Sequence, residues 1–181
     1  MSRVLVEVMT TTELNEWVLA LRRDLARLRT LDSRYGLDLN ELLPPASEEA
    51  TGIPVELAKL FRACDGLSLP NVYNGYFIDP AIRVQSAAAR GEPGMIVGNS
   101  DMSVHVFGSD GGGGRFALGL GDGAVYYLPS WGGVYDGQFI EDSVTRVRKV
   151  ADSVMEFLWR LHQDVHAFVE RNQGHTYMSD S

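Results

Sequence analysis

The sequence predicts an α+β fold in which a central, mostly antiparallel sheet is flanked by helices, with an N-terminal helical extension and a long C-terminal helix. Helical apolar periodicity occupies the two ends of the chain, whereas short β-prone runs separated by turn residues fill its middle. This order of helices, sheet and helix favours α+β over a doubly wound α/β fold. The length of 181 residues and the apolar content of 45% suit one globular core.

Residues 1–49 are expected to form a strand and a helix that pack on the same domain as an extension. Arg3–Met9 alternates like a short strand, and the threonines at 10–12 can cap a helix from about Glu13 to Arg34. The apolar residues of this helix recur at intervals of three and four, which predicts a buried stripe of Leu14, Trp17, Val18, Leu21, Leu25 and Leu28.

The main domain is expected over residues 50–172, followed by a flexible tail at 173–181. Pro54 opens a short helix that ends at Asp65 and Gly66. The β-prone runs that follow are Tyr76–Ile78, Met95–Val97, Val104–Phe107, Arg115–Leu120 and Ala124–Leu128, and Ser143–Val150 is also expected to be extended. The final helix is predicted from Asp152 or Ser153 to about Asn172, and Ser153 and Glu156 have the spacing of a capping box.

The glycine-rich stretch Gly108–Gly123 is predicted to be a β-hairpin. A phosphate loop needs glycines that lead into a helix, usually with Lys and then Ser or Thr, and neither condition is met here. Instead, Gly111–Gly114 precedes a strand pattern, and Asp122-Gly123 is a good tight-turn pair between two such patterns. Anion binding and calcium binding are the lesser alternatives to the hairpin.

Single residues and their spacing predict a non-enzyme without catalytic residues, cofactor or metal. Cys64 is the only cysteine, which excludes an intramolecular disulfide, and it is expected to be a buried small side chain. His105 is expected on the surface of a strand. His162 and His166 are expected on a contact face, with the Arg-rich first helix as a candidate partner, because the general-base Glu of the metalloprotease motif is absent.

The charge and the ends of the chain predict a cytoplasmic protein with neither a membrane nor a nucleic-acid partner. The N-terminus does not match a signal peptide, and no apolar run approaches the roughly 20 residues that span a bilayer. The net charge of −8 opposes nucleic-acid binding, since phosphate neutralisation by Lys and Arg supplies most of that affinity. A basic protein is the more natural partner, and the oligomeric state is left open.

Negative charge and aromatic side chains gather between residues 101 and 142. Six acids in this range stand against Arg115 alone. Aromatic residues lie among the turn glycines of the same region, and Tyr and Trp are favoured at protein contacts, although packing within the sheet is the alternative. The predicted partner-binding residues are Asp101, Asp110, Asp122, Tyr126, Tyr127, Trp131, Tyr135 and Asp136.

Residues 53–169 resemble the SUKH superfamily, the Smi/Knr-type domain common among bacterial immunity proteins. The order and spacing of several pieces carry the resemblance. These pieces are Ile53-Pro54 with Leu57, Leu60 and Phe61 ahead of Asp65-Gly66; Asn74-Gly75-Tyr76; residues 106–111 with Phe116-Ala117-Leu118; and residues 150–153 leading to Phe157-Leu158. The region Met1–Glu49 departs from the simplest family pattern, and it could be a dimerisation element, a partner-specific addition or a lid on the core.

The resemblance implies an α+β domain without a catalytic residue set. Many members of this superfamily neutralise polymorphic toxins, often nucleases, by binding them, and a fungal branch regulates cell-wall synthesis and signalling. The first hypothesis is therefore an immunity-type protein that binds a basic toxin domain. The alternative is a cytoplasmic regulatory or scaffold protein that recruits a partner through its N-terminal helix, and an enzyme acting through the glycine-rich region or His105 ranks third.

Overall fold

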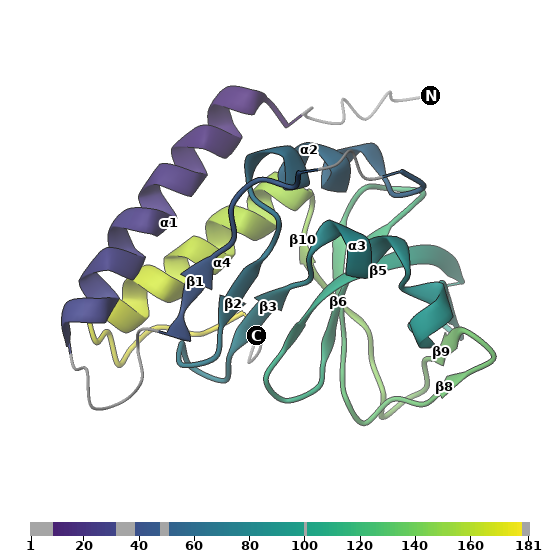
Figure 1. Cartoon of the computed structure of the whole chain (residues 1–181). Helices are drawn as coiled ribbons and strands as arrows, with labels where there is room; N and C mark the ends of the chain where they lie inside the picture. Colours follow the sequence, from purple (N-terminus) through teal and green to yellow (C-terminus); the bar gives the residue numbers. More distant parts are fainter. Residues whose placement is uncertain (1–8, 32–38, 48–50, 100, 179–181) are drawn as a thin grey trace, which may run out of the picture.

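A computed structural model of the chain describes residues 9–31, 39–47, 51–99 and 101–178 (Figure 1). The helices are α1 (Thr11–Leu31), α2 (Val55–Ala63), α3 (Ala81–Gln85), the 3-10 turn η3 (Ala88–Arg90) and α4 (Val154–Val169). The strands are β1 (Glu41–Leu42), β2 (Leu67–Leu69), β3 (Tyr76–Ile78), β4 (Met95–Val97), β5 (Met102–Asp110), β6 (Arg115–Gly119), β7 (Val125–Leu128), β8 (Val134–Tyr135), β9 (Gln138–Ile140) and β10 (Arg148–Ala151). The predicted α+β class is confirmed. The predicted strand Arg3–Met9 lies outside the described residues except for Met9.

The strands form a main antiparallel sheet and a smaller sheet that share β5. The main sheet runs in the order β1-β2-β3-β5-β6-β7-β10. The smaller sheet continues from the first residues of β5 through β4 and β9 to β8, and β4 and β9 are its parallel pair. A register shift between Val106 and Gly108 separates the part of β5 that pairs with β4 from the part that pairs with β3. Such a shift bends a strand, which lets β5 serve both sheets.

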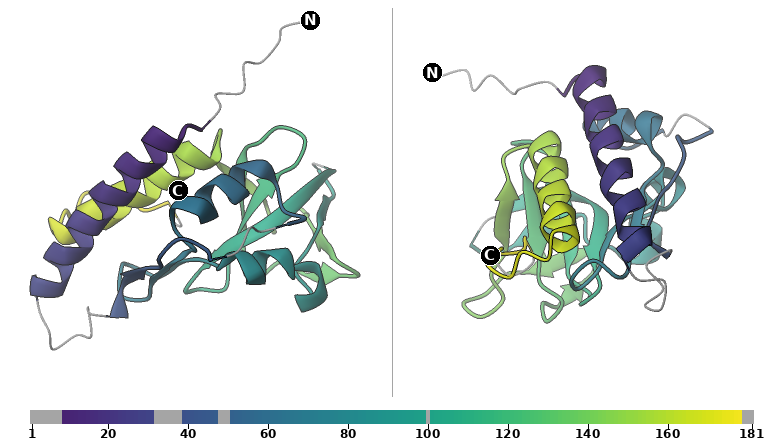
Figure 2. Two further views of the ribbon diagram at one scale, coloured as in Figure 1. Left: turned by 45° about the horizontal axis from the view of Figure 1, so that its top comes forward. Right: turned by 90° about the vertical axis from the view of Figure 1, so that its left-hand side faces the viewer.

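One face of the main sheet carries the larger core, under α4. The ring of Phe157 on α4 lies 5.4 Å from the ring centre of Phe107 and 4.9 Å from that of Phe116, and all three side chains are buried. Helix α1 lies beside α4 on the same side of the molecule (Figure 2). Trp17 of α1 is fully buried and donates from Nε1 to the carbonyl of Leu158 at 2.6 Å. The apolar faces of the two amphipathic helices therefore pack against each other along one buried interface, which we call the seam between α1 and α4.

The opposite face of β5, β6 and β7 carries a second, smaller core against the small sheet. Its buried members are Ile96, Val104, Val106, Ala117, Leu128 and Phe139. Because side chains alternate along a strand, Val125 and Tyr127 of β7 enter the larger core while Leu128 enters the smaller one. Both faces of the central strands are thus covered.

Helix boundaries follow the predicted caps. The hydroxyl of Thr10 accepts a hydrogen bond from the Glu13 backbone N–H, and the Glu13 carboxylate accepts one from the Thr10 backbone N–H. The Ser153 hydroxyl accepts from the Glu156 N–H in the same way at the start of α4. These pairs satisfy N–H groups that have no partner within the helix. Helix α4 ends at Val169, three residues before the predicted end, and Arg171 just beyond it has a φ of 55°.

The described part of the extension belongs to the same body as the rest of the chain. The apolar stripe of α1 lies in the larger core together with residues of α2, α4 and the main sheet. Strand β1 pairs with β2 at the edge of the main sheet. The extension is therefore an integral layer of the domain, and not a lid that could leave the core intact on departure.

The tail predicted as flexible is held against the domain over residues 173–178. Asp164 of α4 is 3% exposed, and its carboxylate accepts hydrogen bonds from the Met178 backbone N–H at 3.0 Å and from the Tyr76 hydroxyl at 2.6 Å. His175 contacts the same carboxylate at 2.6 Å, and the Met178 side chain is buried. The flexibility of residues 173–181 stays a prediction, and the contacts that oppose it for residues 173–178 come from a buried acid on α4 that supplies acceptors.

Candidate functional site

The glycine-rich stretch, predicted to be one hairpin, forms the turns of two successive hairpins. Strands β5 and β6 flank the first turn, and β6 and β7 flank the second, which contains Asp122 and Gly123. The carboxylate of Asp110 closes the first turn by accepting hydrogen bonds from the backbone N–H groups of Gly112 at 3.0 Å and Gly114 at 2.7 Å. The glycines therefore shape turns, and the acid beside them bonds to those turns.

Asp110 and Tyr127 cannot belong to an exposed binding surface, which corrects the prediction for these two residues. Their side chains are buried, and the Tyr127 hydroxyl donates to the Asp110 carboxylate at 2.7 Å. Strand alternation turns Tyr127 toward the larger core, where its hydroxyl needs a buried acceptor. The pair braces the first hairpin against β7.

Tyr126 and Asp122 form a second pair, near the surface. The Tyr126 hydroxyl donates to Asp122 at 2.6 Å, and Asp122 also accepts from the Ala124 backbone N–H at 3.1 Å. Burial and the neighbouring carboxylate raise the pKa of Tyr126 to about 12, so the phenol keeps its proton at neutral pH. The Tyr126 ring is half-buried against the smaller core. Both polar groups are thus engaged within the chain.

The small sheet turns an apolar face to solvent. The cross-strand register places Ile96, Phe139 and Val134 on one face and Met95, Gln138 and Tyr135 on the other. The first face covers the smaller core, whereas the second is exposed. Strands β8 and β9 lie at the end of the molecule remote from α1 (Figure 1).

Two loops beside this face add further exposed apolar side chains. Trp131 is 68% exposed on the loop before β8, and Val144 is 78% exposed on the loop after β9. The loops meet where Gly132 approaches Thr145, because a Cβ at Gly132 would lie 2.7 Å from the Thr145 methyl group. We call the exposed set Met95, Trp131, Tyr135, Asp136, Ile140 and Val144 the tip surface.

Asp136 occupies the turn between β8 and β9, and it is exposed. It has a φ of 49° and Gly137 one of 73°, while Tyr135 and Gln138 pair on either side. Positive φ at both central residues is the type I′ geometry that tight hairpins favour and that Asp-Gly supplies. Within the described parts of the chain, no residue donates a hydrogen bond to the Asp136 carboxylate or forms an ion pair with it.

The other two predicted surface acids differ from Asp136 in their local bonding. Asp101 is exposed and accepts from the Gly98 backbone N–H at 3.0 Å, and Asp122 is committed to Tyr126 and Ala124. Asp142, beside the tip surface, accepts from the backbone N–H groups of Val144 and Thr145, which lowers its pKa. Of the predicted set, Tyr135 and Asp136 are thus accessible neighbours on the β8–β9 hairpin, and Trp131 is accessible on the loop that leads into it.

Two adjacent glycines each make room for one aromatic ring of the hairpin. A Cβ at Gly133 would lie 2.5 Å from Cε2 of Tyr135, and a Cβ at Gly132 would lie 2.2 Å from Cζ of Phe139. The Tyr135 ring therefore rests against the Gly133 backbone on the outside, and the Phe139 ring rests against Gly132 on the inside. The sequence shows the glycines, but only the register shows that each one makes room for a ring.

Glu141 adds a carboxylate behind the tip surface. It is 9% exposed, and its Oε1 accepts from the Val147 backbone N–H at 3.1 Å. Its Oε2 is buried without a hydrogen-bond partner among the residues that the structure describes. When ionised, this group strengthens the negative potential at the same end of the molecule.

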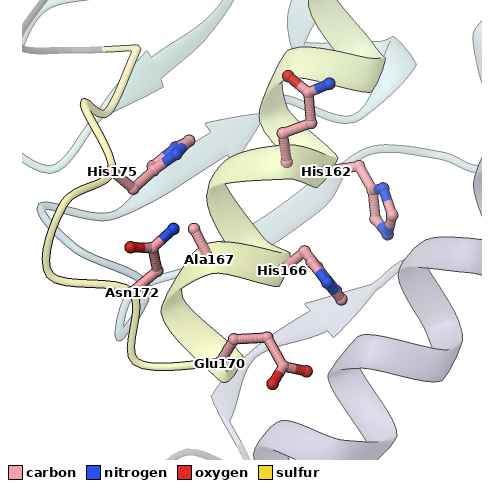
Figure 3. A pocket seen from close by; sticks show the side chains of 7 residues that line it. His162, His166, Ala167, Glu170, Asn172 and His175 are labelled. Atoms are coloured by element: carbon pink, nitrogen blue, oxygen red, sulfur yellow. The ribbon is translucent and has the colours of Figure 1, made fainter.

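The histidines of α4 lie at the seam with α1 (Figure 3). His162 Nε2 lies 3.1 Å and His166 Nδ1 2.9 Å from the same carboxylate oxygen of Asp24, which confirms the contact with the first helix. The partner in that contact is an acid and not an arginine, because Asp24 replaces an apolar residue at a buried position of the α1 stripe. A helical projection of the α1 sequence places Asp24 among the apolar residues of the buried stripe, so the sequence contains the signal for this contact. Among the described residues, no three or more His, Cys, Asp or Glu side chains are placed to hold a metal.

The remaining candidates for chemistry are isolated. Cys64 is fully buried, and burial raises the pKa of its thiol to about 12, so the reactive thiolate is suppressed. His105 lies partly buried with Nε2 3.1 Å from the Val84 carbonyl, and not on an open strand surface.

None of the helices in the described ranges is long and apolar enough to cross a membrane.

The tip surface combines aromatic and aliphatic side chains in solvent with one uncommitted carboxylate on a rigid turn. Comparison with known proteins adds no relative: no family model and no curated protein matches this chain.

Proposed function

We propose that this protein is a non-catalytic protein-binding domain and that the tip surface is where it binds its partner. The observation that carries the proposal is the exposure of Trp131, Tyr135 and Val144, each more than two-thirds exposed, on one hairpin and its flanking loops, with the uncommitted Asp136 at the hairpin turn. Solvent-exposed aromatic side chains in a contiguous group are unusual on a protein that binds nothing. Trp and Tyr at the centre of an interface contribute a large share of its binding free energy.

The charge of the chain favours a basic partner. The net charge is −8, and the exposed acids Asp101, Asp136 and Asp142 belong to the end of the molecule that carries the tip surface. Complementary charge accelerates encounter and disfavours partners of like charge. A positively charged protein surface therefore fits this end of the molecule.

The specific role that we propose is that of an immunity-type protein, which neutralises a cognate toxin by binding it. The resemblance to the SUKH superfamily supports this role. A nuclease toxin fits the electrostatics, because a nuclease carries Lys and Arg to bind the phosphates of its substrate. An acidic protein that covers such a surface blocks the substrate and needs no catalytic group of its own.

The partner is to be sought first in the polypeptide encoded beside this gene, by co-expression and co-purification. Trp131→Ala and Tyr135→Ala are then expected to weaken binding by about tenfold or more each, as central aromatic residues do. Leu120→Ala is the matched control, since Leu120 is 52% exposed on the turn between β6 and β7, outside the tip surface. Unchanged affinity in both aromatic variants would reject the surface.

The second candidate is a cytoplasmic regulatory or scaffold protein of the Smi/Knr type that recruits its partner through the N-terminal helix. The exposed arginines of α1, which include Arg22, Arg23 and Arg29, favour it. Deletion of residues 1–49 does not test this role cleanly, because Trp17 and its neighbours belong to the larger core. The charge reversals Arg22→Glu and Arg23→Glu leave the core untouched. Loss of partner binding in these variants, with Trp131→Ala silent, would favour the second candidate.

A further inference from the structure

We propose that the tip surface receives an arginine side chain of the partner, which stacks on the Tyr135 ring and pairs with the Asp136 carboxylate. This inference rests on the proposed function and names the chemical group that the surface recognises. Tyr135 offers an exposed ring, Asp136 beside it offers a free acceptor, and the surrounding charge is negative.

Tyr135 and Asp136 are positioned before any partner arrives. The Tyr135 ring is 69% exposed, yet one side of it lies against Gly133, where a Cβ would approach Cε2 to 2.5 Å. The type I′ turn fixes the backbone of the next residue, Asp136. A ring and a carboxylate held by the same hairpin lose little conformational freedom on binding, which favours affinity.

The chemistry of this pair selects a guanidinium group. A planar guanidinium stacks on an aromatic face and at the same time offers a fork of N–H donors to a carboxylate, whereas an ammonium group is compact and more strongly hydrated. The chain contains a guanidinium–tyrosine contact of this kind elsewhere: Cζ of Arg148 lies 4.8 Å from the ring centre of Tyr127. At the tip surface, Tyr135 supplies the ring and Asp136 supplies the acceptor, and we propose that the partner supplies the cation.

The chain's own cations do not fill this position in the described residues. Arg115, the one base in the acidic stretch, is bound to Glu92, with Nε 2.6 Å from Oε2. Asp136 has no ion pair within the described ranges. Asp142 beside the surface, whose pKa is lowered by backbone hydrogen bonds from Thr145 and Val144, adds negative charge. A cation brought by the partner is therefore favoured by the local potential.

The test uses the full chain and two short probes, the peptides acetyl-Gly-Arg-Gly-amide and acetyl-Gly-Lys-Gly-amide, followed by nuclear magnetic resonance. The arginine peptide is expected to shift the Tyr135, Asp136 and Gly137 amide signals at a several-fold lower concentration than the lysine peptide. The indole of Trp17, buried and bonded to the Leu158 carbonyl, is the internal reference that stays in place.

Two variants and one control complete the test. Asp136→Asn removes the charge and Tyr135→Leu removes the ring while keeping an apolar side chain, and each is expected to lower the response to the arginine peptide at least threefold. Asp122→Asn is the control, because Asp122 is already engaged by Tyr126 and Ala124. Equal responses to both peptides, no response to either, or an unaltered response in Asp136→Asn would overturn the inference.

Failure of the inference and failure of the proposed function give different results. If the peptides do not distinguish the variants but Trp131→Ala still weakens partner binding, the surface binds its partner by another chemistry. If Trp131→Ala and Tyr135→Ala both leave partner binding unchanged, the proposed surface itself is wrong. In the complex, the substitution of the contacting arginine of the partner by lysine is expected to weaken binding about tenfold.

Discussion

Single carboxylates in this acidic chain have opposite roles that depend on where the backbone places them. Asp24, Asp110 and Asp164 are buried, and each accepts hydrogen bonds from side chains or backbone N–H groups. Asp136 is exposed and takes part in no such bond among the described residues. The first three stabilise the fold, and the fourth is available for recognition.

Substitution of Asp110 by Ala is expected to lower the free energy of unfolding by about 2–4 kcal/mol. The change removes the carboxylate that accepts hydrogen bonds from the buried Tyr127 hydroxyl and from the Gly114 N–H. Urea denaturation at neutral pH measures the loss. Adding Tyr127→Phe should cost less than the two single losses together, since both changes break the same hydrogen bond.

The matched control is Asp122→Ala, at an exposed position on the following turn. Its cost is expected to stay near about 1 kcal/mol or below, since exposed groups regain water as a partner. A stability of Asp110→Ala close to that of the wild type would contradict the brace that we assign to this residue.

The sequence predicted which acids and aromatic residues are concentrated in this region, but not which of them are buried and which are exposed. The clustering of acids and aromatics between residues 101 and 142 is visible in one dimension, and alternation predicts that Tyr126 and Tyr127 face opposite ways. Which of the two enters the larger core depends on the pairing of β7 with β6 and β10. That pairing is a property of the folded sheet, so the burial of Asp110 and Tyr127 could not be predicted from their identity.

At the scale of elements, the seam between α1 and α4 joins apolar packing to a small polar cluster. Asp24 lies between His162 and His166, while Arg27 approaches Asp24 at 3.5 Å and Glu170 at 2.5 Å. Burial lowers the pKa of His162 below its ordinary value of 6.5, and this effect exceeds the opposing attraction of Asp24. The seam is therefore suited to a neutral imidazole at this position.

This seam gives stability a pH dependence whose sign is set by His162. Its pKa is lower in the folded than in the unfolded chain, so its contribution is fully present above about pH 6.5 and is lost as the pH falls toward the folded-state value. We expect the free energy of unfolding of the wild type to fall between pH 7 and pH 5 more steeply than that of His162→Gln. Denaturant titrations at several pH values compare the two slopes.

Arg27 and Glu170 are kept in both proteins of this comparison, and Asp24 and His166 are unchanged, so the difference in slope isolates His162. The substitution itself also changes stability at every pH, and only the slope counts. A wild-type slope equal to or shallower than that of His162→Gln would show that the Asp24 attraction outweighs burial.

Elements with strong local signals were predictable, and those held by pairing alone were not. Strands β3 and β4 have the predicted bounds, and the caps of α1 and α4 form as their spacing indicates. Strands β3 and β4 are only three residues long, but each is a run of apolar, β-prone residues, whereas β1, β2 and β9 each include a polar residue and β8 has only two residues. Asp136-Gly137 did contain a hairpin signal of the kind recognised at Asp122-Gly123, so β8 and β9 could have been found from it.

At the scale of the whole molecule, the last described residues close the larger core. Met178 is 5% exposed, His175 contacts the buried Asp164, and the Tyr177 ring stacks on Tyr73 with centres 4.0 Å apart. The chain that follows α4 thereby returns across the end of β3. The stability of this edge of the domain therefore depends on residues 173–178, which follow the last helix in the sequence.

Met178→Ala is accordingly expected to destabilise the protein by about 2–4 kcal/mol, because it removes a buried apolar side chain. Thr176→Ala, on an exposed neighbour in the same segment, is the control and should cost less than about 0.5 kcal/mol. Chemical denaturation monitored by tryptophan fluorescence measures both. Equal stabilities in the two variants would mean that residues 173–178 behave as the free tail predicted from sequence.

The presence of two cores also bears on how such a protein can diversify. The hairpin of β8 and β9 is anchored by Phe139 against Gly132 in the smaller core, whereas the side chains of Trp131, Tyr135 and Asp136 extend into solvent. Replacement of Trp131 or Tyr135 changes what the tip can recognise and removes little of what holds the hairpin, whereas Asp136, with a φ of 49°, is restricted to residues such as Asn and Gly that adopt this conformation. Single substitutions at the tip can therefore change which partner is preferred while the anchoring residues stay constant. The residues that determine specificity are in this way distinct from those that maintain the fold.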